Sequence, residues 1–273
     1  MKMISSAKMR KAESELRRLL PFREQIEGII GNLLSADATF SSPLTQTSGE
    51  IDHATVLVLG SDDGLCGAYN VNIQKYLSSH IDSLRERYGM GLKVDIMPVG
   101  KKMAKAVVKL ASGNTSIIAA GNCNSKSSGD DVKNLNTELQ NRFVSGSTAR
   151  VDVVFMNFIS MSRQRPAARQ ILPVSTELFK TEGVRASQRP YLFEPDAQTV
   201  FTTALPMFLS AIMQEVFAQN RASEQAARVM AMQSANDNAK KLLDTLHLEY
   251  NKLRQQSITS ELLDIVGGQV KDQ

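Results

Sequence analysis

The sequence predicts a mixed α/β fold, in which an N-terminal and a C-terminal helix pair as an antiparallel two-helix coiled coil around a central α/β domain. Three observations support this prediction. Apolar residues with helical spacing occupy both ends of the 273-residue chain. The middle zone instead alternates short β-branched runs with helical stretches. Aromatic residues make up only 5% of the chain and Trp is absent, which favours helix-on-helix packing over an aromatic-rich β-sandwich.

The first zone, residues 1–42, predicts the N-terminal helix of the coiled coil. Its apolar residues recur at steps of 4, 3, 7, 4 and 3, which is the seam of a helix that packs against another helix. Pro21 is expected to kink this helix, because proline lacks a backbone N–H and crowds the preceding turn. Ser41 and Pro43 then break it. The seam residues are Ala12, Leu16, Leu19, Ile26, Ile30 and Leu33.

The middle zone, residues 53–190, predicts a central Rossmann-like α/β domain. The run Ala54–Leu59 (ATVLVL) ends in Gly60 and has the composition of a buried strand. Strands that alternate with helices of moderate length form βαβ units and a largely parallel sheet. The expected strands are 54–59, 93–99, 116–120, 151–158 and 170–175, and the expected helices are 70–88, 101–110 and 130–144.

The third zone, residues 195–268, predicts one long C-terminal coiled-coil helix, because no glycine occurs in it before Gly267. Some seventy helical residues would extend roughly 105 Å, which exceeds the width of a domain of this size. Most of the helix must therefore project and pair, with the first zone as its antiparallel partner, and its far end should overhang as a single helix. Its apolar stripes are Leu205, Leu209, Ile212 and Val216, followed by Ala235, Ala239, Leu242, Leu246, Tyr250 and Leu253.

Composition and charge exclude several classes of protein. With 42% hydrophobic and 22% charged residues, the chain is not wholly disordered. Its longest continuous apolar runs are too short to cross a bilayer, so no integral membrane anchor is expected. Two cysteines exclude a disulfide scaffold, and neither they nor the three histidines have zinc-site spacing. A net charge of +4 is too small for a dedicated nucleic-acid binder.

The segment Ser61–Asn70 (SDDGLCGAYN) joins the first expected strand to a helix and admits two interpretations. Gly64 and Gly67 would let the backbone approach a phosphate at the helix N-terminus. Against this, the glycine spacing is not that of a dinucleotide-binding loop, and Asp62 and Asp63 would repel phosphate. A tight strand-to-helix turn, in which the glycines supply unusual dihedral angles, is the preferred interpretation.

Other chemistry-bearing residues have plain structural explanations. Gly100-Lys101 does not belong to a P-loop, because Asp95 occupies the position of the required glycine. Cys66 is better explained as a small packed residue than as a nucleophile, because no base lies near it in the sequence. Adjacent carboxylates at a turn, such as Asp62 and Asp63, are more typical of capping groups than of an acid–base pair. The methionines of the helical zones are expected to fill cores, with a sliding contact as the alternative.

Two sets of polar residues indicate protein contacts. The basic stretch Lys2–Arg23 contains no base-stacking pattern of aromatics, so we interpret it as the charged face of a coiled coil that meets an acidic protein surface. Arg254 and Gln255 lie near the far end of the long helix, and the sequence offers no evident partner for them. Because a guanidinium can hold a carboxylate with two hydrogen bonds, Arg254 is a candidate contact to another chain.

Several strings resemble the gamma subunit of bacterial F-type ATP synthases, over residues 1 to about 268. The longest are Ala222–Asn238 (ASEQAARVMAMQSANDN) and Tyr250–Gly268 (YNKLRQQSITSELLDIVGG), both in the expected C-terminal helix. Ala7–Lys11 (AKMRK), Ser61–Asn70 and Tyr191–Asp196 (YLFEPD) also resemble segments of that family. The resemblance implies a coiled coil inside a hexamer of alternating alpha and beta subunits.

This resemblance implies a central-stalk rotor that has neither a catalytic site nor a cofactor of its own. In the family, proton flow turns the c ring and the stalk with it, and the stalk drives the beta-subunit sites through different conformations. The implied partners are the alpha, beta, delta and epsilon subunits and the c ring, at the cytoplasmic face of the bacterial inner membrane. By the same resemblance, the residues that contact the beta subunit are Arg254, Gln255, Lys8 and Arg10, and those that face the c ring and epsilon are Tyr191 and Glu194.

The chain departs from the family pattern in two places. Asp63 stands where the family usually has arginine, which puts any role of that arginine in doubt here. The sequence begins at Met1 within the family's N-terminal helix, which indicates a late start codon or a fragment.

The residues alone also leave two other functions open. One is an enzyme that uses a phosphate or dinucleotide on the central domain, which requires nucleotide binding at Ser61–Asn70. The other is a basic coiled-coil adaptor for nucleic acid, whose affinity would fall steeply with salt.

Overall fold

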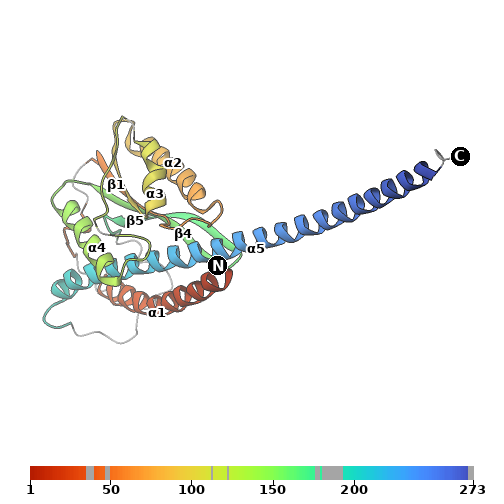
Figure 1. Cartoon of the computed structure of the whole chain (residues 1–273). Coiled ribbons are helices and arrows are strands. Elements are labelled where there is room, and N and C mark those ends of the chain that lie inside the picture. The colour runs from red at the N-terminus through yellow and green to blue at the C-terminus, as the bar shows by residue number, and fades with distance from the viewer. Residues whose placement is uncertain are drawn as a thin grey trace. The chain divides into compact units, whose positions relative to one another are not determined.

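The computed structural model describes residues 1–34, 40–46, 50–111, 113–121, 123–175, 179 and 193–269 (Figure 1). The chain divides into two compact units, Met1–Val229 and Met230–Gln273, and each is described by itself.

The first unit is built around a five-stranded sheet with strand order β3-β2-β1-β4-β5. Strand β1 pairs in parallel with both β2 and β4, β2 pairs in parallel with β3, and β5 is antiparallel to β4. The predicted largely parallel sheet is therefore confirmed. The strands are β1 His53–Leu59, β2 Lys93–Val99, β3 Thr115–Ile117, β4 Arg150–Ser160 and β5 Arg163–Leu172.

Three shorter helices connect these strands. Helix α2 spans Tyr69–Tyr88, α3 spans Lys101–Val107 and continues as a 3-10 turn to Leu110, and α4 spans Gly129–Val144. The start of α4 is fixed by a capping box, in which the Ser128 hydroxyl accepts from the backbone N–H of Asp131 and the Asp131 carboxylate accepts from that of Ser128.

Alternate residues of β1 pack into two different hydrophobic clusters, so the sheet is covered on both faces. Leu57 and Leu59 belong to a cluster that includes residues of α1, α4 and α5. Val56 and Val58 belong to a second cluster with residues of α2 and α3. This strict alternation explains why the sequence shows a continuous apolar run rather than a polar–apolar one. The unit has three layers, with helices on either side of the sheet (Figure 1).

Helices α1 (Lys2–Leu34) and α5 (Ala197–Gln269) pair antiparallel within the first unit (Figure 1). Glu15 of α1 pairs with Arg221 of α5, whereas Arg23, further along α1, pairs with the earlier Glu215. The predicted seam of α1 is buried except for the half-buried Leu19, and the first predicted stripe of α5 is buried throughout. The coiled-coil pairing of the terminal helices is thus observed, and Pro21 lies inside α1 without ending it.

Several predicted element bounds were wrong. The last strand begins at Arg163 rather than at residue 170, and it forms a hairpin with β4. Pro166 and three arginines hid it in the sequence. An edge strand tolerates a proline, since one of its sides has no ladder hydrogen bonds to lose. Strand β3 covers only three residues, rather than the predicted 116–120.

The second unit consists of the rest of α5. Every described side chain from residue 234 to 265 is exposed. The second predicted apolar stripe falls here, and its members Leu242, Leu246, Tyr250 and Leu253 are each more than half exposed. The ion pairs of α1 described above fall on residues of α5 that precede this unit.

Helix α5 also contains an 18-residue window, within Ala197–Ile265, with a mean hydropathy of 1.4, and 61% of that window is buried. By length and composition alone, such a helix could cross a membrane. A helix that is apolar on all sides is equally typical of a protein core, which its burial here favours. Counting only continuous apolar runs, as above, overlooks this window.

Candidate functional site

The crevice at the carboxyl ends of β1 and β4 is where a sheet of this topology would hold a ligand. Strand β1 is followed by α2, which packs on one face, whereas β4 is reached through α4, which packs on the other. The strand order therefore reverses between β1 and β4, and ligands of doubly wound sheets bind in the crevice at such a point. The turn after β1 and the end of β4 border this crevice.

A side chain of α5 occupies this crevice. Oδ1 of Asn220 accepts hydrogen bonds from the Tyr69 hydroxyl at 2.7 Å and from the backbone N–H of Met156 at 3.2 Å. Its Nδ2 donates to the carbonyl oxygen of Gly60 at 3.4 Å. One turn later, the Ser223 hydroxyl donates to the Met156 carbonyl at 2.9 Å. Asn220 is 3% exposed, so α5 provides buried hydrogen-bond partners for polar groups at this point of the sheet.

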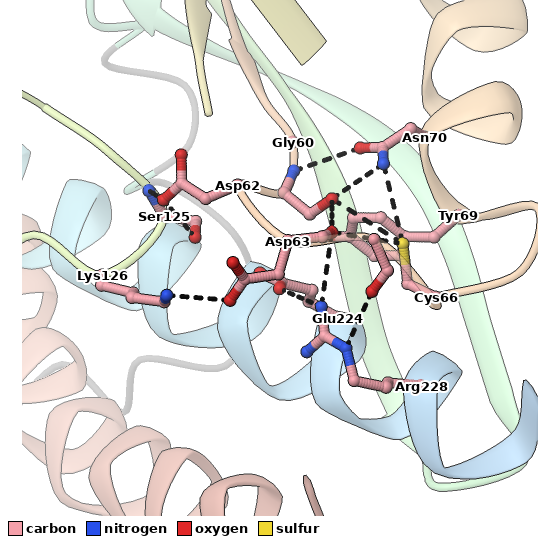
Figure 2. Close-up of polar contacts among 12 residues, drawn as sticks. Gly60, Asp62, Asp63, Cys66, Tyr69, Asn70, Ser125, Lys126, Glu224 and Arg228 are labelled. Atoms are coloured by element: carbon pink, nitrogen blue, oxygen red, sulfur yellow. Dashed lines mark hydrogen bonds and ion pairs between the residues drawn. The ribbon is translucent and has the colours of Figure 1, made fainter. Parts of the chain in front are cut away.

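A second contact between α5 and the turn after β1 lies two helical turns further on. Nε of Arg228 donates to the Gly64 carbonyl at 3.1 Å, and Nη2 of the same residue lies 2.7 Å from Oε1 of Glu224 (Figure 2). Both side chains are buried. Burial raises the pKa of Glu224, while the hydrogen bond and charge of Arg228 act in the opposite direction. Arg228 thus binds the turn while it balances a buried carboxylate.

The turn Ser61–Asn70 is tight and internally hydrogen-bonded, as predicted (Figure 2). Nδ2 of Asn70 donates to the Ser61 hydroxyl at 2.8 Å, and Oδ1 of Asn70 accepts from the Ser61 backbone N–H at 3.1 Å. Leu65 and Gly67 both have positive φ, which explains the glycine at the second of these positions. Cys66 is buried, with its sulfur 3.6 Å from Nδ2 of Asn70, and it is a packed residue of the turn.

The two aspartates of the turn have different surroundings. Oδ1 of Asp62 accepts from the backbone N–H of Lys101 at the start of α3, and Oδ2 accepts from the N–H and hydroxyl of Ser125. Asp62 is therefore a capping and bridging group. Asp63 lies 2.8 Å from Nζ of Lys126, and both side chains are more than half exposed. The hydrogen bond from Lys126 lowers the pKa of Asp63.

A cleft of about 260 Å³ lies beside this turn, between α1, α5 and the segment before α4. Lys8, Lys11 and Lys126 contribute cations to its wall, and Glu15 and Glu224 contribute carboxylates. Glu15 is already paired with Arg221 at 2.6 Å across the two helices. The cleft wall is thus basic.

Comparisons with known proteins agree with this architecture. A family model described as ATP synthase matches residues 1–270. The ATP synthase gamma chain of Parabacteroides distasonis is 35% identical over 269 residues, which cover 98% of this chain and 90% of the relative. That of Phocaeicola vulgatus is 36% identical over 272 residues, with 98% and 91% covered. The chain belongs to the ATP synthase gamma-chain family. Family membership makes it a central-stalk rotor subunit of a membrane-associated F1Fo ATP synthase.

Solved structures share the fold of this gamma-chain family member. A chain of the Euglena gracilis mitochondrial ATP synthase, solved with OSCP, F1 and the c-ring, matches with a TM-score of 0.56 and 19% identity, over 97% of this chain and 94% of that one. A chain from the central stalk and c-ring of the Tetrahymena thermophila mitochondrial enzyme matches with a TM-score of 0.58 and 17% identity, over 86% and 97% of the two chains. At these identities the likeness shows the fold alone.

The residues predicted to contact partners of this gamma chain lie in separate places. Lys8 and Arg10 are exposed on α1, and Lys8 lines the basic cleft. Arg254 and Gln255 are exposed on α5, in the second unit. Glu194 is exposed just before α5 begins. Tyr191 lies outside the described residues. The contacts of all six with other subunits stay predictions.

Sequence reasoning overlooked the α5 residues that bind the sheet, although a signal was present. The buried stripe that ends at Val216 continues at steps of 4 and 3 to Asn220 and Ser223. Polar residues that fall on an apolar stripe are candidates for buried hydrogen bonding, since a buried polar group needs a partner. Glu224 and Arg228 follow directly and are buried as well. Within the described residues, no group of three or more His, Cys, Asp or Glu side chains is arranged to hold a metal ion.

Proposed function

We propose that this rotor subunit couples rotation of a c ring to conformational cycling of catalytic sites on beta subunits, and that it has no catalytic site of its own. The observation that carries the proposal is the exposed apolar stripe of α5, which includes Leu246, Tyr250 and Leu253. A contiguous exposed apolar surface marks a place where another protein binds. A stripe along one helix fits a groove or sleeve formed by partner subunits.

The mechanism follows from differential binding. A rotor presents a different face to each catalytic subunit at each angle, and each conformation of a catalytic site prefers a different contact. Rotor angle thereby biases which nucleotide state each site adopts, by as much as the contacts differ in free energy. Where a ligand would bind in an enzyme of this fold, the buried Asn220 instead binds Tyr69 and the Met156 backbone.

The partners are the alpha and beta subunits of a hexamer, the delta and epsilon subunits, and the c ring. The similar solved assemblies contain F1 and the c-ring, which supports the hexamer and the c ring as partners. The curated relatives are bacterial, which supports a place at the cytoplasmic face of the inner membrane, attached through the complex. The domain division 1–42, 53–190 and 195–268 is part of the proposal, and neither nucleic acid nor a cofactor has a role in it.

Specific residues carry the proposed contacts. Arg254 and Gln255 contact a beta subunit, as do Lys8 at the basic cleft and the exposed Arg10 of α1. Tyr191 and Glu194 face the c ring and epsilon. Arg254 is exposed on α5, and an arginine that becomes enclosed at an interface often carries a large share of the binding energy.

The test is ATP synthesis by the assembled complex in membrane vesicles. Arg254→Ala is expected to lower the rate about tenfold or more, which corresponds to a loss of roughly 1.4 kcal/mol. Lys241→Ala, which removes another exposed cation of α5, is the matched control and is expected to change the rate less than twofold. Normal synthesis with Arg254→Ala would remove Arg254 from the interface, and synthesis by a complex that lacks the chain would overturn the proposed function.

A further inference from the structure

The long helix and the sheet are held together by a small buried polar joint. Asn220 is its centre, since this one amide binds the hydroxyl of α2 residue Tyr69, the β4 backbone at Met156 and the carbonyl of Gly60, the residue after β1. Ser223 adds a bond to Met156. Helix α2, strand β4 and the residue after β1 thus all bind one turn of α5.

We propose that Asn220 is a positioning residue that fixes the rotation of α5 against the sheet and so transmits torque between them. The inference rests on the proposed coupling function and names the place in this chain where the helix and the sheet are locked. Apolar side chains resist separation of two elements but are non-directional, so a helix seated only on them can roll. Hydrogen bonds have defined lengths and angles, and those of Asn220 point to three fixed atoms.

The position of the joint favours this role over simple stability. On the same face of α5 as Asn220, one turn before it, lie the buried apolar side chains of Val216 and Phe217. Their contacts are non-directional and define no single rotation of the helix. At this part of α5 the directional contacts are therefore the polar ones. Tyr69 is rigid in turn, because its ring is buried in the second hydrophobic cluster.

The test uses the assembled complex in inverted membrane vesicles, with ATP hydrolysis and ATP-driven proton pumping measured together. Asn220→Leu fills the same space but removes the side-chain acceptor of the Met156 N–H, and it leaves the Tyr69 hydroxyl with only the backbone carbonyl of residue 220, at 3.1 Å. Protons pumped per ATP hydrolysed are expected to fall about tenfold, while hydrolysis in the presence of an uncoupler stays within about twofold. Without uncoupler, the wild type slows against the proton gradient, whereas the variant is expected to hydrolyse at its uncoupled rate.

Val58→Ala is the stability-matched control. It cuts a fully buried side chain of β1 on the face packed against α2, and it removes no polar group. It is expected to reduce the amount of assembled complex and to leave protons per ATP unchanged, because its cost is a cavity in the core. Asn220→Leu behaving like this control, with full coupling in every assembled complex, would overturn the proposal.

Tyr69→Phe keeps the inference testable if Asn220→Leu does not assemble. It removes one donor and retains the ring, so protons per ATP are expected to fall about two- to threefold. An unchanged ratio in Tyr69→Phe would then overturn the joint. Wild-type vesicles separate this inference from the proposed function: no pumping by the wild type would refute the function, whereas pumping by both wild type and variants would refute only the joint.

Discussion

The hydroxyl of Tyr69 lies 2.7 Å from Oδ1 of Asn220, although the two residues are 151 positions apart in the chain. This bond joins α2, the helix that follows β1, to the long helix α5, which follows all the strands. Both side chains are buried, and burial raises the pKa of the Tyr69 hydroxyl well above its usual range. The hydroxyl is therefore protonated at neutral pH, where it donates this bond.

The first prediction concerns the stability that this bond contributes. Tyr69→Phe is expected to lower the free energy of unfolding of the full chain by about 1–2 kcal/mol, because the Asn220 amide loses its shortest partner inside the protein. Urea unfolding monitored by circular dichroism measures the change. Tyr250→Phe is the matched control, since its ring is 64% exposed, and it is expected to change stability by less than about 0.5 kcal/mol. Equal effects of the two substitutions would contradict the assignment.

The second prediction uses two adjacent isoleucines of α1. Ile30 is fully buried in the cluster shared with α5 and the sheet, whereas Ile29 is 46% exposed. Ile30→Ala removes three buried carbons and leaves a cavity, so we expect a loss of about 2–5 kcal/mol. Ile29→Ala removes the same atoms from a partly hydrated site and is expected to cost less than about 1 kcal/mol. Urea unfolding of both variants checks the difference; a cost at residue 29 as large as at residue 30 would mean that α1 packs through another face.

The layers of the fold could be predicted from the sequence, because the apolar periodicity is strong. Ala54–Leu59 contributes to both hydrophobic clusters, and a strand buried on both faces has no polar position to obscure it. Leu205, Leu209, Ile212 and Val216 predicted the buried stripe of α5 by spacing alone. The start of strand β5 was predicted wrongly, because edge strands carry prolines and charges that make them look unlike strands in the sequence.

The polar joint could not be predicted in the same way. Asn220 and Ser223 on their own suggest a solvent-facing helix position, since most asparagines and serines are exposed. Their burial depends on the turn after β1 and on the Met156 backbone, which lie at least 64 residues away. Tertiary pairing of this kind leaves only a weak mark in the sequence, namely a polar residue on an apolar stripe. Arg254 is the opposite case, because its predicted role depends on a chain other than its own.

The third prediction compares two carboxylates that pair with arginine. Glu215 is 6% exposed and lies 3.1 Å from Nε of Arg23 and 3.6 Å from Nη1 of Arg169. Glu215→Gln keeps the shape but removes the counter-charge of Arg169 and leaves Arg23 with Glu27 alone, so a loss of about 1–3 kcal/mol is expected.

Glu13 provides the control for this comparison, because its partner Arg17 is 77% exposed. An ion pair that is exposed to water contributes little to the free energy of unfolding, so Glu13→Gln is expected to lower it by less than about 0.5 kcal/mol. Urea unfolding of both variants at low and high salt is the measurement. Only the Glu215 effect should persist at 1 M salt, because buried pairs are screened less than exposed ones. A Glu215 effect that vanished with salt would show that the pair is hydrated.

The last prediction concerns Asp63, the exposed aspartate of the turn after β1. The hydrogen bond from Lys126, followed by the charges of Lys126, Arg228 and Lys8, holds the pKa of Asp63 below its ordinary value. A carboxyl group with a lowered folded-state pKa stabilises the protein above its unfolded pKa, and this contribution is lost as the pH falls through the folded value. Since Asp63 and Lys126 are more than half exposed, the contribution is expected to be less than about 1 kcal/mol.

Asp63→Asn and Lys126→Gln both remove this pair and test it from either side. Each variant should be less stable than the wild type at pH 7 by a few tenths to about 1 kcal/mol, and the difference should shrink as the pH falls below about 4. Urea unfolding between pH 3 and pH 8 gives the two curves. The double variant should lose less than the sum of the single ones, because each single substitution already breaks the pair. Additive losses, or a difference that grew toward acid pH, would show that Asp63 and Lys126 act independently, and the turn would then have no local counter-charge for its aspartate.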